Sequence, residues 1–253
     1  MPDLRCFCCP PELEPTEIRL DADESHHLVT TNRAREGDTV VAFDGKGNEW
    51  VCALAGADRK EATLRVRFIQ KAKPLPYRIT LAQALPKGRH MDSIVRMATE
   101  VGAAVIAPVQ SDRTIVKVDA AGEEHKLEKW EAVAIEAAKQ CGNAWLPQIT
   151  PVQSAEQFIT TSARDHDLRL IASLQPGARP LRAVLSRFRE EKGRAPARVA
   201  WMIGPEGDFT TAEMALARNH GFEPVSLGPL VLRCETAAIF ALSILSYELQ
   251  NPA

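Results

Sequence analysis

The feature that most constrains this chain is a short apolar run that stops at a turn containing two glycines. Residues 199–203 have the composition of a buried strand, and Gly-Pro-Glu-Gly at 204–207 cannot continue it. Thr210 followed by Glu213 forms a capping box, which predicts that a helix starts there and ends at Gly221. A strand, a glycine turn and a helix are therefore expected in direct succession.

A second unit of the same kind follows at once. Residues 224–227 form another short apolar run, Gly228 and Pro229 end it, and an apolar helix is expected to finish near Tyr247. In open α/β sheets, ligands bind where strands hand over to helices. Glycine lets backbone N–H and C=O groups approach a flat polar ligand. Each turn alone is equally well explained as an ordinary tight turn, so the pair carries more weight than either member.

Composition favours two domains over one. The chain has 253 residues, of which 45% are hydrophobic and 25% charged, which suits one large or two smaller cores. Its longest apolar stretch, 237–245, is too short to span a bilayer. The N-terminus lacks a basic region followed by an apolar segment. We therefore expect a cytoplasmic protein with no membrane partner.

The six cysteines leave one alternative open. A core-rich chain of this length does not need disulfides, so reduced thiols are expected. Cys6, Cys8 and Cys9, with His26 or His27, offer metal-ligating side chains, but no second cysteine pair completes a zinc set. A strand of small apolar side chains explains the three cysteines more simply, and no metal is expected.

Positive charge is concentrated between residues 59 and 89, although the net charge of the chain is −2. Nine Lys or Arg residues stand there against a single acid, Glu61. Such a stripe suits the phosphates of a nucleic acid. A solvated strand face is the alternative, because alternation directs Arg65 and Arg67 outward in any case.

Patterning along the chain gives the order of the elements. Residues 1–73 are expected to be all-β, with a hairpin turn at Asp44–Asn48, and 71–76 reads as a linker with two prolines. Strands and helices alternate from there, which predicts a parallel sheet. The expected strands cover residues 77–85, 103–109 and 168–174, and the expected helices cover 91–102 and 125–142.

The two glycine turns carry a family resemblance. GPEGDF at 204–209 and LGPLVLRCETA at 227–237 resemble the C-terminal signature of the SPOUT methyltransferases. Within them the chain is most similar to the RsmE-type family, the bacterial methyltransferases of uridine N3 in small-subunit ribosomal RNA. TEVG at 99–102 and PVQSDRT at 108–114 also resemble family motifs, and residues 24–40 resemble the family's N-terminal PUA-like module.

The resemblance implies an α/β fold in two domains. Residues 1–73 are then a PUA-like β-barrel that binds RNA, and residues 74–253 are a SPOUT methyltransferase domain with a parallel sheet. Sequence reasoning alone favours an unknotted sheet, because knots are nearly absent from proteins. SPOUT domains instead tie a deep C-terminal trefoil knot, bind S-adenosylmethionine in the knotted loops and form homodimers around them. We expect the same from about Arg198 onward.

The implied activity is S-adenosylmethionine-dependent methylation of N3 of a specific uridine in 16S ribosomal RNA of the small subunit. Direct in-line displacement needs no metal, and catalysis comes from alignment and from removal of the weakly acidic N3–H proton. Arg233 is the candidate to stabilise the developing anion or to orient the substrate. Glu206 and Glu235 are candidate proton acceptors, with a structural cap or salt bridge as the alternative for both.

The remaining candidate residues fall into two groups. The cofactor is expected against the backbone and small side chains of Leu174, Ile203, Gly204, Pro205, Gly207, Leu227, Gly228, Leu232, Thr236 and Ala237. Ribosomal RNA is expected to contact Arg33, Arg65, Arg67, Lys87, Arg89, Arg113 and Gln140.

Several positions depart from the family pattern: Met97 replaces a lysine, Lys139 an acid, Asn143 and Leu230 arginines, and Asp208 a glycine. Arg194 or Arg198 is a candidate to supply the missing positive charge. Two other functions stay open. One is a different SPOUT enzyme that methylates a ribose 2′-oxygen, and the other is an RNA-binding homologue without turnover.

Overall fold

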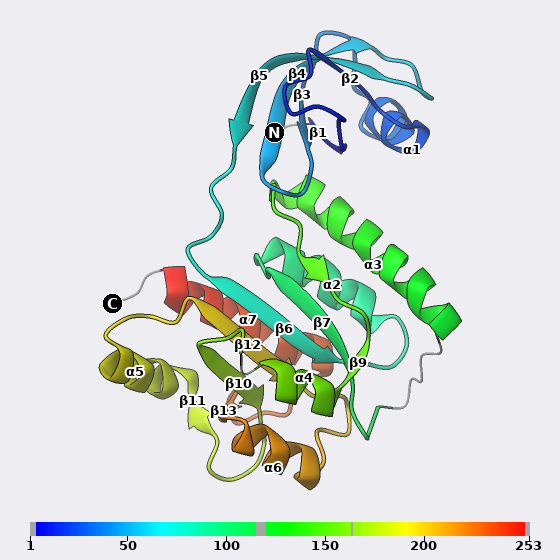
Figure 1. Cartoon of the computed structure of the whole chain (residues 1–253). Coiled ribbons are helices and arrows are strands. Elements are labelled where there is room, and N and C mark those ends of the chain that lie inside the picture. The colour runs from blue at the N-terminus through cyan, green and yellow to red at the C-terminus, as the bar shows by residue number, and fades with distance from the viewer. Residues whose placement is uncertain (1–3, 115–119, 163, 251–253) are drawn as a thin grey trace. The chain divides into compact units, whose positions relative to one another are not determined.

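The computed structural model of the chain describes residues 4–114, 120–162 and 164–250 (Figure 1). The chain forms two compact units. The first comprises Met1–Pro74 together with Ile135–Leu146, and the second comprises Leu75–Ala134 and Pro147–Ala253.

The first unit is built on a five-stranded sheet in the order β1-β3-β4-β5-β2. Its strands are β1 (Leu4–Phe7), β2 (Glu17–Arg19), β3 (Thr39–Phe43), β4 (Asn48–Gly56) and β5 (Thr63–Lys71). β3 and β4 pair antiparallel with Phe43 opposite Glu49, which confirms the hairpin predicted at residues 44–48. Asp44 fixes that turn, because its Oδ1 accepts hydrogen bonds from the N–H groups of Lys46 and Asn48.

The expectation that residues 1–73 are all-β is wrong for one segment. Residues 22–31 form a short helix, α1 (Ala22–His26), which continues into a π-helical turn, η1 (His27–Thr31). Asp21 caps α1 by accepting the N–H of Glu24 at 2.8 Å, and two acids occupy the first turn, where the helix dipole favours them. Buried Ser25 fastens the helix to the sheet by accepting the N–H of Ala62 at 2.8 Å.

The core of the first unit explains two of its cysteines. Cys6 and Cys52 are fully buried beside Trp50 and Leu64, so they pack as small apolar side chains. Burial raises the pKa of the Cys6 thiol well above its ordinary value and that of the Cys52 thiol to about 11.

Residues 135–146, which comprise the end of a long helix and the segment after it, belong to this unit, and the sequence pattern does not indicate this. α3 (Ala120–Cys141) brings Lys139 to Glu24, with Nζ 2.5 Å from Oε1. Beyond α3, Leu146 donates its N–H to the carbonyl of Gly45 at 2.9 Å. The Trp145 indole donates to the Ala72 carbonyl at 3.2 Å.

The second unit contains an eight-stranded sheet with the main order β11-β13-β10-β12-β6-β7-β8, and β9 pairs with β7. Every strand pair in it is parallel, as predicted. Its strands are β6 (Arg78–Ala84), β7 (Val105–Gln110), β8 (Gln148–Ile149), β9 (Gln153–Ser154), β10 (Leu168–Ala172), β11 (Arg179–Pro180), β12 (Arg198–Ile203) and β13 (Phe222–Ser226).

Helices cover both faces of this sheet (Figure 1). The remaining helices are α2 (His90–Glu100), α4 (Ala155–Ser162), α5 (Leu181–Lys192), α6 (Thr211–Asn219) and α7 (Cys234–Gln250). α4 and α6 share a core with Ala82 and Met202. The residues that alternate with these point to the opposite face, where α7 packs on β6, β12 and α2.

The local predictions for the second unit hold in most places. Thr210 and Glu213 form the predicted capping box at the start of α6. The long last helix begins at Cys234 and runs to Gln250, three residues beyond the expected end at Tyr247. In the described part of the chain, no helix combines the length and the apolar character needed to cross a membrane.

Candidate functional site

The carboxyl ends of three neighbouring parallel strands define the site. β10 lies between β12 and β13, with Ile171 level with Met202 and Ala172 level with Val225. The segments that follow these strands therefore leave the sheet at one edge. They enclose a cavity of about 490 Å³, a size typical of small-molecule sites.

The cavity is lined by segments from distant parts of the sequence. The loop before α2 and the start of α2 contribute Lys87 and His90, and the end of β10 contributes Ala172, Ser173 and Leu174. The end of β12 contributes Ile203, and the turn after it contributes Gly204, Pro205, Glu206 and Asp208. The segment from β13 into α7 contributes Leu227, Leu230, Val231, Leu232, Arg233, Cys234, Glu235 and Ala237.

The turn after β12 is held in a shape that ordinary residues adopt with difficulty. A Cβ atom on Gly204 would lie 3.2 Å from Asp208 Oδ1 and 3.4 Å from the Phe209 ring. Asp208 itself has φ 58°, in the left-handed region that glycine and, less readily, aspartate adopt. Its Oδ1 accepts the N–H of Phe209 at 2.8 Å. Asp208 therefore preserves the conformation of the turn at a position where the family has glycine.

Two contacts from other segments brace the same turn. Arg113 lies against Gly207, where a Cβ atom would be 3.4 Å from the arginine side chain, and its Nη1 donates to the Gly207 carbonyl at 2.7 Å. Glu206 accepts the backbone N–H of Lys87 through Oε1 at 3.0 Å. The loop after β7 and the loop after β6 are therefore both tied to the turn after β12.

The start of α7 forms the other wall. Glu235 lies in its first turn, where the helix dipole favours a carboxylate, and its Oε1 is 3.5 Å from Nδ1 of His90. Arg233 is exposed just before the helix, and its carbonyl accepts the N–H of Ala237 at 2.8 Å. Burial raises the pKa of the Cys234 thiol to about 11, so this cysteine stays a thiol at neutral pH.

The structure brings together most of the predicted cofactor and catalytic residues. Arg233, Glu206 and Glu235 all line the cavity. Of the predicted cofactor residues, seven line it as well: Leu174, Ile203, Gly204, Pro205, Leu227, Leu232 and Ala237. Gly207, Gly228 and Thr236 do not line it, although each is next to or one residue away from a lining residue.

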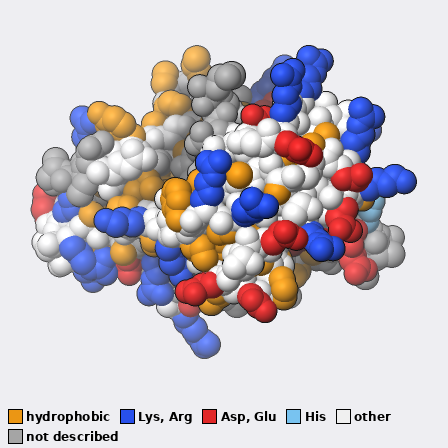
Figure 2. Space-filling model, turned by 90° about the horizontal axis from the view of Figure 1, so that it is seen from above, with side chains coloured by type: hydrophobic (Ala, Val, Ile, Leu, Met, Phe, Trp, Pro, Cys, Tyr) orange, Lys and Arg blue, Asp and Glu red, His pale blue; other side chains and the backbone are white. Residues whose placement is uncertain are grey.

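The predicted RNA contacts divide between the two units. Arg33, Arg65, Arg67 and Gln140 are exposed on the first unit. In the second unit, Lys87 lines the cavity, Arg89 precedes α2 as its N-cap residue, and Arg113 braces Gly207. The face seen in Figure 2 carries Lys and Arg interspersed with Asp and Glu rather than a field of one sign.

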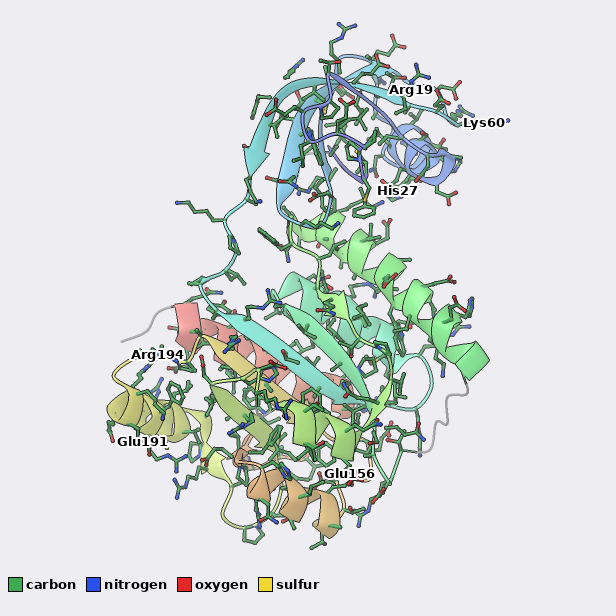
Figure 3. All side chains as sticks on the ribbon, viewed as in Figure 1. Arg19, His27, Lys60, Glu156, Glu191 and Arg194 are labelled. Carbon is green, nitrogen blue, oxygen red and sulfur yellow. The ribbon has the colours of Figure 1, made fainter. Side chains whose placement is uncertain are left out.

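Neither candidate for the missing positive charge, Arg194 or Arg198, lies at the cavity. Arg198 begins β12, whereas the cavity lies beyond Ile203 at the far end of that strand. Arg194, labelled in Figure 3, lies in the loop between α5 and β12. It pairs with Asp167, 3.3 Å away. The expectation that either residue compensates for Leu230 or Asn143 is wrong.

Sequence reasoning missed two polar residues of the cavity, Ser173 and His90. Of these, His90 is the one that can accept or donate a proton near neutral pH. Its partner Glu235 is far away in the sequence, and no motif joins the two. One clue to His90 is present in the sequence: it stands at the start of a predicted helix, directly after the basic loop 87–89. Within residues 4–114, 120–162 and 164–250, His, Cys, Asp and Glu side chains form no group of three that could hold a metal ion.

Comparison with known proteins now adds the family. Residues 73–246 match the model of the RNA methyltransferase domain, and residues 20–67 match that of the RNA methyltransferase PUA domain. The chain belongs to the RNA methyltransferase family. The expected RsmE-type membership is confirmed by relatives named ribosomal RNA small subunit methyltransferase E.

Two of these relatives align with the chain over most of its length. The Synechocystis sp. protein is 32% identical over 98% of this chain and 78% of its own length. The Bacillus subtilis protein is 31% identical over 93% of this chain and 91% of its own length.

Two solved methyltransferase structures share the fold over nearly the whole chain. A methyltransferase of Legionella pneumophila in complex with the bound cofactor SAM is 30% identical, with 97% of both chains covered and a TM-score of 0.85. The ribosomal RNA small subunit methyltransferase E of Neisseria gonorrhoeae, bound to S-adenosyl methionine, is 26% identical, with 97% of both chains covered and a TM-score of 0.83.

Proposed function

We propose that this family member transfers a methyl group from S-adenosylmethionine to N3 of a specific uridine in 16S ribosomal RNA of the small subunit. The observation that carries the proposal is the cavity at the carboxyl ends of β10, β12 and β13. Residues from both C-terminal family motifs, 204–209 and 227–237, line this cavity. The relatives' names support the substrate class, and the Legionella and Neisseria structures support the cofactor.

The residues present fit S-adenosylmethionine. The cavity combines apolar side chains such as Leu174 and Leu227 with the open backbone of Gly204, a lining suited to a nucleoside. Glu206 and Glu235 add carboxylates, which favour a sulfonium cation. The residues that we assign to cofactor binding are Leu174, Ile203, Gly204, Pro205, Gly207, Leu227, Gly228, Leu232, Thr236 and Ala237.

The chemistry needs alignment, charge stabilisation and removal of one proton. When bound, the cofactor supplies an electrophilic methyl group. Arg233 is exposed at the cavity, and we assign it to the uracil oxygens, where it stabilises the anion that develops as N3–H ionises. Glu206 and Glu235 also line the cavity and are candidates to accept the proton, and Glu206 in addition holds the loop at Lys87 through the backbone N–H.

We assign residues 1–73 to RNA binding as a PUA-like β-barrel, and residues 74–253 to the SPOUT methyltransferase domain. Support for the first assignment comes from the PUA match at 20–67 and from exposed Arg33, Arg65, Arg67 and Gln140. In the second unit, Lys87, Arg89 and Arg113 stand at or beside the cavity and are assigned to RNA. A ribosomal substrate implies a cytoplasmic enzyme.

A trefoil knot is part of the same proposal. β13 lies outside β10 in the sheet, yet α7, which follows β13, packs on β6 and β12. The segment 227–233 must therefore cross the carboxyl ends of β10 and β12 on its way to α7. We infer that this crossing passes through the loop after β10 and ties the knot around the cavity.

We also propose a homodimer through the knotted domain. α7 leaves Phe240 and Tyr247 exposed, at 43% and 67%. They are seven residues apart and so share one face of the helix. Exposed apolar faces of this kind mark protein contacts. The mass in solution, measured by light scattering, tests this part: a single-chain mass contradicts it.

The test of the reaction is nucleoside analysis of the product. The protein is incubated with labelled S-adenosylmethionine and small ribosomal subunits that lack the modification, and the RNA is digested to nucleosides. The expected labelled product is N3-methyluridine. A 2′-O-methylated nucleoside in its place identifies a ribose methyltransferase. Cofactor binding without any labelled nucleoside identifies an RNA-binding homologue without turnover on this substrate.

A further inference from the structure

The cavity contains a histidine that the family motifs do not account for. His90 is the first residue of α2, and its side chain is 49% exposed, so a substrate can reach it. Glu235 approaches it from the start of α7, with Oε1 3.5 Å from Nδ1, at the outer limit of a hydrogen bond. Such contacts are often long in ligand-free sites and shorten when the substrate binds.

We propose that His90 is the catalytic base that removes the N3 proton of the uracil, and that Glu235 is the positioning residue that orients it. This assignment rests on the methyl transfer proposed above. A carboxylate facing Nδ1 favours the tautomer with the proton on Nδ1, and Nε2 is then a free acceptor. The same division of labour between carboxylate and imidazole occurs in catalytic triads.

The two carboxylates of the cavity are less suited to be the base. Glu206 already accepts the Lys87 N–H and fixes the turn after β12. Glu235 faces His90. An ordinary imidazole is also a stronger base than an ordinary carboxylate, and it therefore better matches a weakly acidic N–H group near neutral pH.

The step balances in atoms and charge. The N3–H proton moves to Nε2 of His90, and the N3 electron pair forms the new bond to the methyl carbon. The bond between methyl and sulfur breaks, and its electron pair stays on sulfur as a neutral thioether. The imidazolium then returns the proton to water.

The groups that set the charge around His90 come from several elements. Lys87 belongs to its own loop, Glu206 and Asp208 come from the turn after β12, and Arg233, Cys234 and Glu235 come from the start of α7. Two positive side chains, Lys87 and Arg233, and three carboxylates therefore line the same cavity as the imidazole.

The test compares wild type with His90→Gln, Glu235→Gln and the control His125→Gln, an exposed histidine on α3. Single-turnover methyl transfer at saturating cofactor is measured across pH. For His90→Gln we expect the rate to fall by about 100-fold or more, with unchanged cofactor affinity. The wild-type rate should fall on the acid side as the base is protonated, and that limb should be absent from His90→Gln. Glu235→Gln should lower the maximal single-turnover rate and leave unchanged the concentration of small subunits that gives half of that rate.

A second readout needs no cofactor and no turnover. Nitrogen NMR of the histidine-labelled protein reports the tautomer, and the His90 signals are those missing from His90→Gln. We expect wild-type His90 to carry its proton on Nδ1, and Glu235→Gln to lose that preference. An Nε2-protonated His90 in the wild type contradicts the assignment.

The outcomes separate the two proposals. If wild type makes N3-methyluridine and His90→Gln makes it at the same rate, the base assignment is wrong and the proposed function stands. If wild type makes no N3-methyluridine at any pH, the proposed function fails and the assignment of His90 fails with it.

Discussion

Arg113 donates from Nη1 to the carbonyl oxygen of Gly207 at 2.7 Å, and its side chain lies along the face that the glycine leaves open. An arginine after β7 thus holds the turn after β12, which lines the cavity. Removing it in Arg113→Ala should weaken cofactor binding by about 1 kcal/mol, or about five-fold in Kd, because the turn loses a charged hydrogen bond. Isothermal calorimetry with S-adenosylmethionine measures this.

Arg164→Ala is the matched control for that measurement. Arg164 is exposed between α4 and β10, at the end of the sheet opposite the cavity. Its replacement should leave Kd unchanged. Equal affinities of wild type and Arg113→Ala show that the contact does not support the cofactor site.

Asp208 occupies a position where its backbone needs φ 58°. Asp208→Ala should lower the free energy of unfolding by about 1 kcal/mol, because alanine has no side-chain oxygen for the Phe209 N–H and adopts this region at a cost. Asp208→Gly should stay close to wild type, since glycine adopts this conformation freely. Urea unfolding compares the three proteins, and an Asp208→Gly protein as unstable as Asp208→Ala refutes the backbone explanation.

Lys139 is buried where the family has an acid, and it pairs with both Glu24 at 2.5 Å and Glu136 at 2.6 Å. Lys139→Met should destabilise the first unit by about 3 kcal/mol, because the partly buried Glu24 loses its cation. Lys129→Met on the same helix is the control, since its ion pair with Asp92 is more exposed and should cost at most about 1 kcal/mol. If urea unfolding shows that Lys139→Met and Lys129→Met lose the same free energy of unfolding, this account is contradicted.

Local signals in the sequence predicted much of the second unit. The capping box of Thr210 and Glu213 and the parallel sheet were readable because they depend on spacing and alternation within short windows. The start of α1 was also readable in principle, since Asp21 with two acids after it is a helix signal. The β-branched run at 29–31 obscured it, because such residues favour strands.

Contacts between distant segments were beyond such reasoning. Lys139 meets Glu24, and His90 meets Glu235, only because the fold brings separate elements together. Arg194 and Arg198 failed as site residues for the same reason. Both arginines stand shortly before the Gly-Pro-Glu-Gly turn at 204–207 in the sequence. That closeness in sequence does not reveal that the length of β12 separates them from the cavity.

His166 makes stability depend on pH. Burial lowers the pKa of its imidazole below the ordinary 6.5, and its nitrogens contact the Ser162 carbonyl at 3.0 Å and the Thr80 hydroxyl at 2.9 Å. The unfolded chain therefore binds the proton more tightly than the folded one. The contribution of neutral His166 is present above about pH 6.5 and is lost as the pH falls below that value.

His166→Gln tests the sign of that dependence. At neutral pH the variant should lose about 1 to 2 kcal/mol with its hydrogen bonds. Between about pH 7.5 and pH 5 its free energy of unfolding should decline less than that of wild type, because the amide does not titrate. Parallel declines of the two proteins in urea unfolding contradict a titrating His166.

The most direct test of the central claim is the yield of N3-methyluridine from Arg233→Ala with unmodified small subunits. Arg233 is exposed at the cavity and is assigned to the developing uracil anion. The account predicts that wild type and Arg164→Ala form N3-methyluridine, and that Arg233→Ala still binds S-adenosylmethionine but reacts about 100-fold more slowly or worse. N3-methyluridine formed by Arg233→Ala at the wild-type rate would show that the chemistry takes place without this arginine, and would contradict the proposed active site.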